Sequence, residues 1–224
     1  MESLKTELHC HNIFSNGHVG TLEPIYDCNV TIPKQLEQAY LAGLDVLFVT
    51  NHNTIDGYRQ MLEYKKNHQK FDALKVYPAE EVTTDNESHV LVYGIDHSIK
   101  SGLSLHEVLD EAKKQNAVTT APHPFSLLDA LREDSVYCDL FEAFNSSNVD
   151  VYSNLRAKKF AKEKSLHVVA GSDSHVQSTI GRSTNLIHSE NKLDSVIAAM
   201  KHHKIIICLL YTSDAADEGL GVDL

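Results

Sequence analysis

The chain has 224 residues and is 42% hydrophobic, which suits one domain of ordinary size with a packed core and excludes a disordered chain. The formal net charge of −11 disfavours nonspecific binding to long nucleic acid, which needs a basic face. No apolar run approaches the roughly 18 residues that span a bilayer, and the N-terminus lacks the pattern of a secretory signal. The four cysteines form no disulfide framework and no CxxC pair, so we expect a cytoplasmic protein without a membrane partner.

Short apolar runs alternate with amphipathic stretches along the chain. Strands are predicted at residues 5–10, 45–50, 75–82, 89–93, 117–121, 140–144 and 167–170. Helices are predicted at residues 32–42, 104–116, 148–164 and 192–202, the second of them opening on a capping box of Ser104 and Glu107. Strands that alternate with helices predict an α/β fold with a parallel sheet, either open or closed into a barrel.

Residues 208–224 (CLLYTSDAADEGLGVDL) break the character of the sequence before them. They resemble a translated transposase-type sequencing adapter, and we leave them out of the fold as a sequence that is not native. The expected organisation is a single domain over residues 1–207, whose native sequence continues differently beyond that point.

Histidine is unusually frequent, with 14 residues against 7 phenylalanines and no tryptophan. Histidine is the commonest protein metal ligand and also acts as a general acid or base. Six of the 14 histidines lie in motifs at the ends of predicted strands, where barrels and parallel sheets place their active sites. In chain order these motifs are ELHCH with His9 and His11, TNHN with His52, AEEVTT with Glu81, the run HVLVYGI opened by His89, APHP with His123, and GSDSH with Asp173 and His175.

The first and last motifs carry the clearest local signals. His9 and His11 are two residues apart, so both would project from the same face of a strand and share a metal. Asp173 and His175 have the same spacing and follow an apolar strand that ends in glycine. Glu80, in contrast, is interpreted as a solvated loop residue.

Together the motifs offer at least six histidines and two carboxylates, which exceeds the four or so ligands that one metal uses. We therefore expect two or three divalent metal ions. Mixed imidazole and carboxylate ligands suit Zn²⁺, Mn²⁺ or Fe²⁺ better than Ca²⁺.

In this order the motifs resemble the PHP (polymerase and histidinol phosphatase) superfamily over roughly residues 7–182. ELHCHNIFSNG is similar to the family's (D/E)LHxHxxxS(D/N)G segment, TNHNTIDG to its TDHD segment, and AEEVTT to its GxE(V/I)(S/T)T segment, which aligns Glu81 rather than Glu80 with the ligand. The resemblance implies a distorted (β/α)₇ TIM-like barrel with a trinuclear metal site. The implied ligands are His9, His11, His52, Glu81, His89, His123, Asp173 and His175.

The chain also departs from the superfamily pattern. The family usually has Asp where this chain has Asn16, and the Asp of its TDH segment is Asn51 here, with Asn53 after the histidine. Because asparagine is neutral and a poorer metal ligand, one metal position is expected to be weakly filled, or the centre to be binuclear. Asn16 and His18 are both candidates for the missing ligand. An insertion over residues 19–31 forms either a lid or a surface excursion.

The resemblance implies hydrolysis of a phosphate monoester or nucleotide by a metal-activated hydroxide. His123 or His175 would protonate the leaving group. Arg182, soon after the last ligand pair, would either clamp a phosphate oxygen by bidentate hydrogen bonds or be an ordinary surface arginine.

Three other functions remain open at this point. One is a 5′-to-3′ exonuclease on short RNA or DNA, so the expected partner is a small phosphorylated substrate or a short oligonucleotide. Another is a metal-binding module without catalysis, suggested by Asn16. The last is an amidohydrolase-like enzyme acting on C–N bonds, which is disfavoured because no lysine lies among the strand-end motifs.

Overall fold

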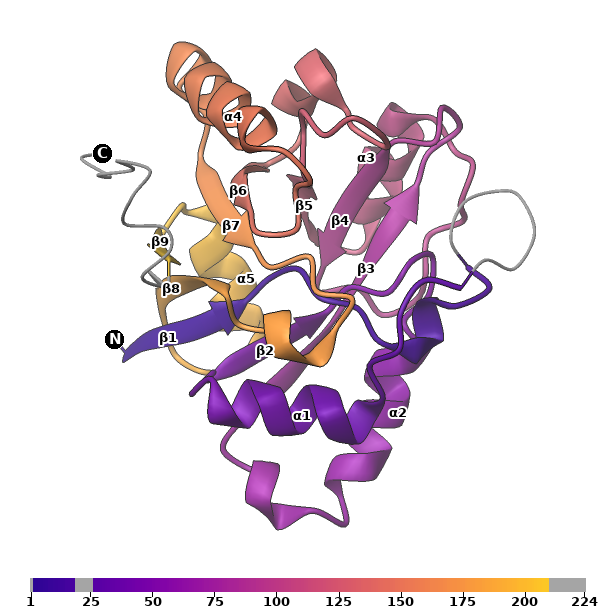
Figure 1. The fold of residues 1–224 in the computed structure, drawn as a ribbon, viewed down its shortest axis with the longest axis vertical. Helices are drawn as coiled ribbons and strands as arrows, with labels where there is room; N and C mark the ends of the chain where they lie inside the picture. The colour runs from indigo at the N-terminus through magenta and orange to yellow at the C-terminus, as the bar shows by residue number, and fades with distance from the viewer. Residues whose placement is uncertain (1, 19–25, 210–224) are drawn as a thin grey trace.

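The computed structural model describes residues 2–18 and 26–209. These residues form nine strands and five α-helices (Figure 1). The strands are β1 (Glu2–Glu7), β2 (Val46–Val49), β3 (Lys75–Thr83), β4 (His89–Tyr93), β5 (Val118–Ala121), β6 (Leu140–Asn145), β7 (Val168–Gly171), β8 (Ser183–Ser189) and β9 (Ile205–Leu209). The helices are α1 (Ile32–Leu41), α2 (Asp56–Lys65), α3 (Leu105–Lys114), α4 (Val151–Lys164) and α5 (Leu193–Lys201). No helix within this part of the chain is long and apolar enough to cross a membrane.

The described strands form one sheet in the order β7-β6-β5-β4-β3-β2-β1-β8-β9. From β1 to β7 the neighbouring strands are parallel, except that β4 runs antiparallel to both β3 and β5. β8 then pairs antiparallel with β1, and β9 antiparallel with β8. The reversal of β4 is what distorts the regular β/α alternation.

The sheet curls until β7 returns to β1, and the contact is made beyond the ends of both strands. The backbone N–H of Asp173 donates to the carbonyl of His9 at 2.8 Å, and that of His11 donates to the carbonyl of Ser174 at 3.0 Å. Within the strands, the side-chain amide of Asn185 in β8 makes two hydrogen bonds with the backbone of Ala170 in β7. The predicted single-domain, distorted (β/α)₇ barrel is confirmed.

Strand pleating sorts side chains between the barrel interior and the helical layers, because successive residues point to opposite faces. In β2, Val46 and Phe48 pack inside the barrel with side chains of α5, whereas Leu47 and Val49 pack against α1 and α2. A third cluster lies under α3 and α4 on the other side. Figure 1 shows α1 and α2 together along one side of the barrel and α3 and α4 along the opposite side.

Seven predicted strands and four predicted helices are present, with ends shifted by up to three residues, and Ser104 and Glu107 form the expected capping box. α2 was not predicted; its Gly57 and Met61 are buried, and its Tyr58 and Tyr64 pack partly buried against the cluster under α1 and α2. β8 was missed because buried polar residues interrupt its apolar pattern. β9 extends two residues beyond position 207, and residues 210–224 lie outside the described residues.

Candidate metal centre

Two neighbouring strands bring the first ligand candidates to the same end of the barrel. Glu81 follows Tyr77 and Ala79 on the inward face of β3, so its carboxylate enters the interior near the end of that strand. His89 opens β4, and it lies at this same end because β4 is reversed and pairs Thr83 with His89. The antiparallel strand thus places its first residue where the parallel strands place their last.

The carboxylate of Glu81 is the centre of the cluster, and each of its oxygens faces different imidazoles. Oε2 lies 3.2 Å from Nε2 of His9 and 3.2 Å from Nε2 of His11. Oε1 lies 3.0 Å from Nδ1 of His89 and 3.1 Å from Nε2 of His123. The Glu81 carboxylate thus separates one pair of imidazoles from another, with one oxygen toward each pair.

Asp173 and His52 extend the cluster on either side of Glu81. Oδ1 of Asp173 lies 3.3 Å from Nε2 of His9 and 3.4 Å from Nε2 of His11. Nδ1 of His52 lies 3.7 Å from Oε2 of Glu81. His9, His11 and Asp173 form one group with ligand atoms within 4.8 Å of one another, and further groups of this kind are His9-Glu81-His123 and His52-Glu81-His89.

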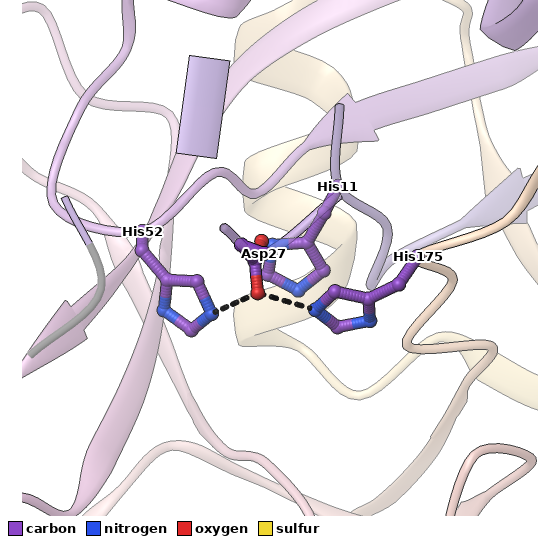
Figure 2. A group of neighbouring side chains, drawn as sticks. All are labelled: His11, Asp27, His52 and His175. Atoms are coloured by element: carbon purple, nitrogen blue, oxygen red, sulfur yellow. Dashed lines mark ion pairs between the residues drawn. The ribbon is translucent and has the colours of Figure 1, made fainter. Parts of the chain in front are cut away.

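A fourth group contains a residue that the sequence patterns did not reveal, Asp27. Its carboxylate lies between His52 and His175, beside the ring of His11, as Figure 2 shows. Asp27 lies in the predicted insertion, away from every recognised motif, and residues 19–25 of that insertion lie outside the described residues. The signal that pointed to it was indirect: the acidic ligand usual at the position of Asn16 was missing.

Three other predicted site residues lie apart from these groups. The side-chain amide of Asn16 is hydrogen-bonded to the backbone of Asp27 and Cys28. His18 is exposed, and its carbonyl accepts a hydrogen bond from Asn53. Arg182 is exposed too, and among the described residues no contact joins its side chain to the histidine cluster. All eight ligands implied by the resemblance do converge in the groups above.

The residues present fit metal ions. Two ligand atoms bound to one tetrahedral ion at about 2.1 Å are separated by about 3.4 Å, which is the range of spacings found here. Nε2 of His11 and Nδ1 of His89 lie 3.2 and 3.0 Å from Glu81 oxygens, yet neither atom makes a hydrogen bond within the described chain. Buried polar atoms normally have a partner, and a cation held by each nitrogen and its neighbouring ligand atoms would supply one.

A second carboxylate orients the ligands from behind. Oε1 of Glu142 lies 3.0 Å from Nδ1 of His9, which places the ring proton on Nδ1 and leaves Nε2 facing Glu81. Oε2 of Glu142 accepts from the backbone N–H of His123 at 2.6 Å and from the side chain of Asn145 at 2.8 Å. Glu142 therefore fixes ligands that come from two different strands.

The electrostatics of the cluster are strongly coupled. Burial raises the pKa of Glu81, but its electrostatic interactions with the neighbouring histidines, that with His9 the largest, outweigh burial and hold that pKa well below its usual value. Burial together with neighbouring histidines lowers the pKa of His52 to about 3, against the pull of Glu81. His52 is thus neutral at physiological pH, the form in which imidazole binds metals.

The interpretation of Glu80 as a solvated residue was wrong. Glu80 points away from Glu81 on the opposite face of β3, where it is buried, and its Oε1 accepts the backbone N–H of Ile99 at 2.5 Å. Burial raises the pKa of Glu80 to about 7. Neither carboxylate is solvated, because β3 is covered on both faces.

Backbone strain coincides with the centre. The backbone φ is +29° at His123 and +49° at Asp173, values that residues other than glycine rarely adopt. Such conformations cost about 1–3 kcal/mol each and persist where the surroundings hold them for function.

Known proteins are similar to this chain in sequence or in fold. A family profile described as PHP-associated matches residues 151–205. The uncharacterised protein MJ1587 of Methanocaldococcus jannaschii is 30% identical over 166 residues, which cover 71% of this chain and 93% of that protein.

Two solved structures are similar at low identity. The lesion-specific endonuclease EndoQ of Pyrococcus furiosus has a TM-score of 0.69 at 17% identity, covering 94% of this chain and 60% of that one. A putative metal-dependent phosphoesterase from Bifidobacterium adolescentis has a TM-score of 0.58 at 16% identity, covering 77% and 88%. At these identities the likeness shows a shared fold.

Proposed function

The chain belongs to the PHP superfamily, and from that premise we propose that it is a hydrolase of phosphoric esters that works with divalent metal ions. The substrate class is a phosphate monoester or a nucleotide. Zn²⁺, Mn²⁺ and Fe²⁺ are the metals that suit the mixture of imidazole and carboxylate ligands. The proposed ligands are His9, His11, His52, Glu81, His89, His123, Asp173 and His175.

The observation that carries this proposal is the position of Glu81. One carboxylate oxygen faces His9 and His11, and the other faces His89 and His123. These residues would hold two cations close together, and such a pair of cations can stabilise both the attacking and the leaving oxygen in phosphoryl transfer.

When bound, the metal ions would supply an activated water at neutral pH and neutralise charge on the phosphoryl oxygens. The protein's own part is to hold the imidazoles in place, with a ring nitrogen of each facing the proposed metal positions. Glu142 does this for His9 by fixing its proton on Nδ1. A site buried in this way also excludes bulk water, which strengthens every charge interaction with the substrate.

His175 is among the proposed ligands and is also the proposed proton donor to the leaving group, a role that it can fill only while its Nε2 is not bound to a metal ion. Its side chain is 33% exposed, whereas those of His9 and His11 are fully buried, so His175 lies at the open side of the cluster. Burial lowers the pKa of His175, but its contact with Asp27 and the charge of Asp173 outweigh it and raise that pKa to about 9. His123 is the alternative donor, and Arg182 is the proposed phosphate clamp.

Nucleic acid is the second substrate class, favoured by the fold likeness to EndoQ, whose solved complex holds duplex DNA. The net charge of −11 argues against a long backbone and leaves short oligonucleotides. Backbone contacts would give a steep dependence of binding on salt, which a small monoester would not.

The test is a hydrolysis panel on chelator-treated protein reloaded with Mn²⁺ or Zn²⁺. The panel contains an aryl phosphate, nucleoside monophosphates and short 5′-phosphorylated oligonucleotides. Metal-dependent phosphate release is expected from the wild type and from Glu63→Gln, an exposed control, and at least a hundredfold less from Glu81→Gln. Activity that survives chelation, or that Glu81→Gln retains in full, would contradict the proposal.

A further inference from the structure

We infer that Asp27, with His52 and His175, holds a third cation, and that Asn16 positions Asp27 instead of binding the metal itself. The inference deepens the proposed function and rests on it. In this chain the acidic ligand expected at position 16 is replaced by a carboxylate eleven residues further along, held in place by the asparagine that stands at the usual position.

The geometry of Asp27 is that of a ligand. Its Oδ1 lies 3.1 Å from Nε2 of His175 and 3.8 Å from Nε2 of His52, and Figure 2 shows both rings turned toward it. The stacked ring of His11 completes the group, with its centroid 4.3 Å from that of His175. Two imidazoles and one carboxylate form a ligand set that suits Zn²⁺ better than Mg²⁺ or Ca²⁺.

An independent observation concerns the other oxygen of the same carboxylate. The side chain of Asp27 is 10% exposed, and its Oδ2 is buried without a hydrogen-bond partner in the described chain. A carboxylate oxygen buried in this way is costly unless a cation or donor satisfies it. A bound metal would satisfy it.

The contacts of Asn16 explain why asparagine stands where the family usually has aspartate. Its Oδ1 accepts the backbone N–H groups of Asp27 at 2.7 Å and Cys28 at 3.0 Å, and its Nδ2 donates to the carbonyl of Cys28 at 3.0 Å. An aspartate would present an oxygen to that carbonyl and would lose this third bond. The amide is therefore suited to holding the Asp27 backbone, and neither of its polar atoms is free for a metal.

The segment that carries Asp27 is also tied to the other ligand loops. The thiol of Cys28 donates to the carbonyl of His175 at 3.3 Å. The carbonyl of Val30 accepts the N–H of Ile13 at 2.9 Å, two residues after His11. Asp27 is thus fixed relative to two of the histidines it faces.

Zn²⁺ binding to the whole chain tests the inference, measured by calorimetric titration after chelation and by elemental analysis. The wild type is expected to hold three ions per chain. Asp27→Asn keeps the shape and removes the charge, and it is expected to hold two ions or to bind the third at least tenfold more weakly. Asp56→Asn, an exposed aspartate that pairs with Arg59, is the matched control and should equal the wild type.

A second variant separates positioning from ligation. If Asn16 positions Asp27, Asn16→Asp weakens the third ion by tenfold or more and leaves the first two unchanged. If position 16 is the ligand, the added carboxylate strengthens the third ion, and the inference fails. This variant keeps Asp27 intact, so it decides the question even if circular dichroism shows that Asp27→Asn does not fold.

The remaining outcomes separate this inference from the proposed function. A wild type that holds two ions, or an Asp27→Asn variant that holds three with unchanged affinity, overturns the inference alone, whereas a wild type that holds one ion or none overturns the proposed function as well. A wild type that holds three ions, loses the third in Asp27→Asn and hydrolyses no phosphoric ester removes the proposed function and leaves the inference standing.

Discussion

The side-chain amide of Asn185 in β8 takes the place of a strand neighbour for Ala170 in β7. Its Oδ1 accepts the backbone N–H of Ala170 at 2.9 Å, and its Nδ2 donates to the carbonyl of the same residue at 2.7 Å. Both residues are fully buried. One side chain thus satisfies the polar backbone at the seam where the barrel closes.

Asn185→Ala is expected to destabilise the protein by about 2–4 kcal/mol, because a buried N–H and a buried C=O of Ala170 would both lose their partner. Urea unfolding of the metal-free protein measures this. Asn67→Ala, at an exposed asparagine, is the control and should change the free energy of unfolding by less than about 0.5 kcal/mol. Equal stability of the two variants would show that the seam does not depend on this amide.

Gly171→Ala is expected to disturb the metal centre by steric displacement alone. A Cβ at this position would lie 1.9 Å from Oε1 of Glu142 and 2.7 Å from Cβ of His9, so both residues would have to move. We expect a loss of about 1–3 kcal/mol in unfolding free energy, together with weaker metal binding.

Gly43→Ala is the control that distinguishes general backbone strain from displacement of Glu142 and His9. Gly43 has φ +63° and no atom within 4 Å of the added Cβ, so the substitution costs about 1 kcal/mol of backbone strain far from the centre. Unchanged metal affinity is expected there. Metal affinity that falls equally in both glycine variants would mean that general destabilisation, and not movement of Glu142, is responsible.

Glu142→Gln is expected to weaken metal binding about 10–100-fold. Glutamine lacks the negative charge that supports His9. Its one side-chain oxygen can replace either Oε1, which faces His9, or Oε2, which accepts two hydrogen bonds, but not both. Competition with a chelator of known affinity gives the dissociation constants. Glu111→Gln, at a partly exposed residue that pairs with Lys114, is the control. If both variants bound the metal with the same affinity, Glu142 would have no orienting role.

The burial of Glu80 predicts a pH-dependent stability in the metal-free protein. Its pKa is raised from 4.5 to about 7 in the fold, so the protonated form is favoured. The associated stability is fully present below about pH 4.5 and is lost as the pH rises to about 7. Glu80→Gln does not titrate, so its unfolding free energy should gain on the wild type by ~3 kcal/mol across this range. A difference that stays constant from pH 4.5 to 8 would contradict the buried, protonated carboxyl.

Much of the metal centre could be predicted because its ligands follow local patterns. His9 with His11, and Asp173 with His175, have a spacing of two residues at the end of an apolar strand, and that pattern survives any detail of the fold. His89 opens its strand, and no local pattern indicated that β4 is reversed. The resemblance to the PHP superfamily, more than the strand pattern, identified it as a ligand.

Asp27 and Glu80 show where sequence reasoning stops. The segment of Asp27 is held at the centre by a hydrogen bond from the backbone N–H of Asp27 to Oδ1 of Asn16, and no periodicity in the sequence encodes a contact of that kind. Glu80 was misjudged because polarity alone suggests exposure, whereas β3 is covered on both faces and leaves no solvated position. Both errors concern tertiary contacts that local propensity does not specify.

Because Glu80 and Glu81 are adjacent in β3, the centre is sensitive to a register shift of that strand. A slip of β3 by one residue against β2 and β4 would turn Glu80 into the barrel and bury Glu81 beneath the helices. The misaligned strand would still present a carboxylate to the histidines, but Tyr77 and Ala79 would leave the interior at the same time. The aromatic and aliphatic residues below the metal centre therefore favour the register that turns Glu81, and not Glu80, toward the histidines.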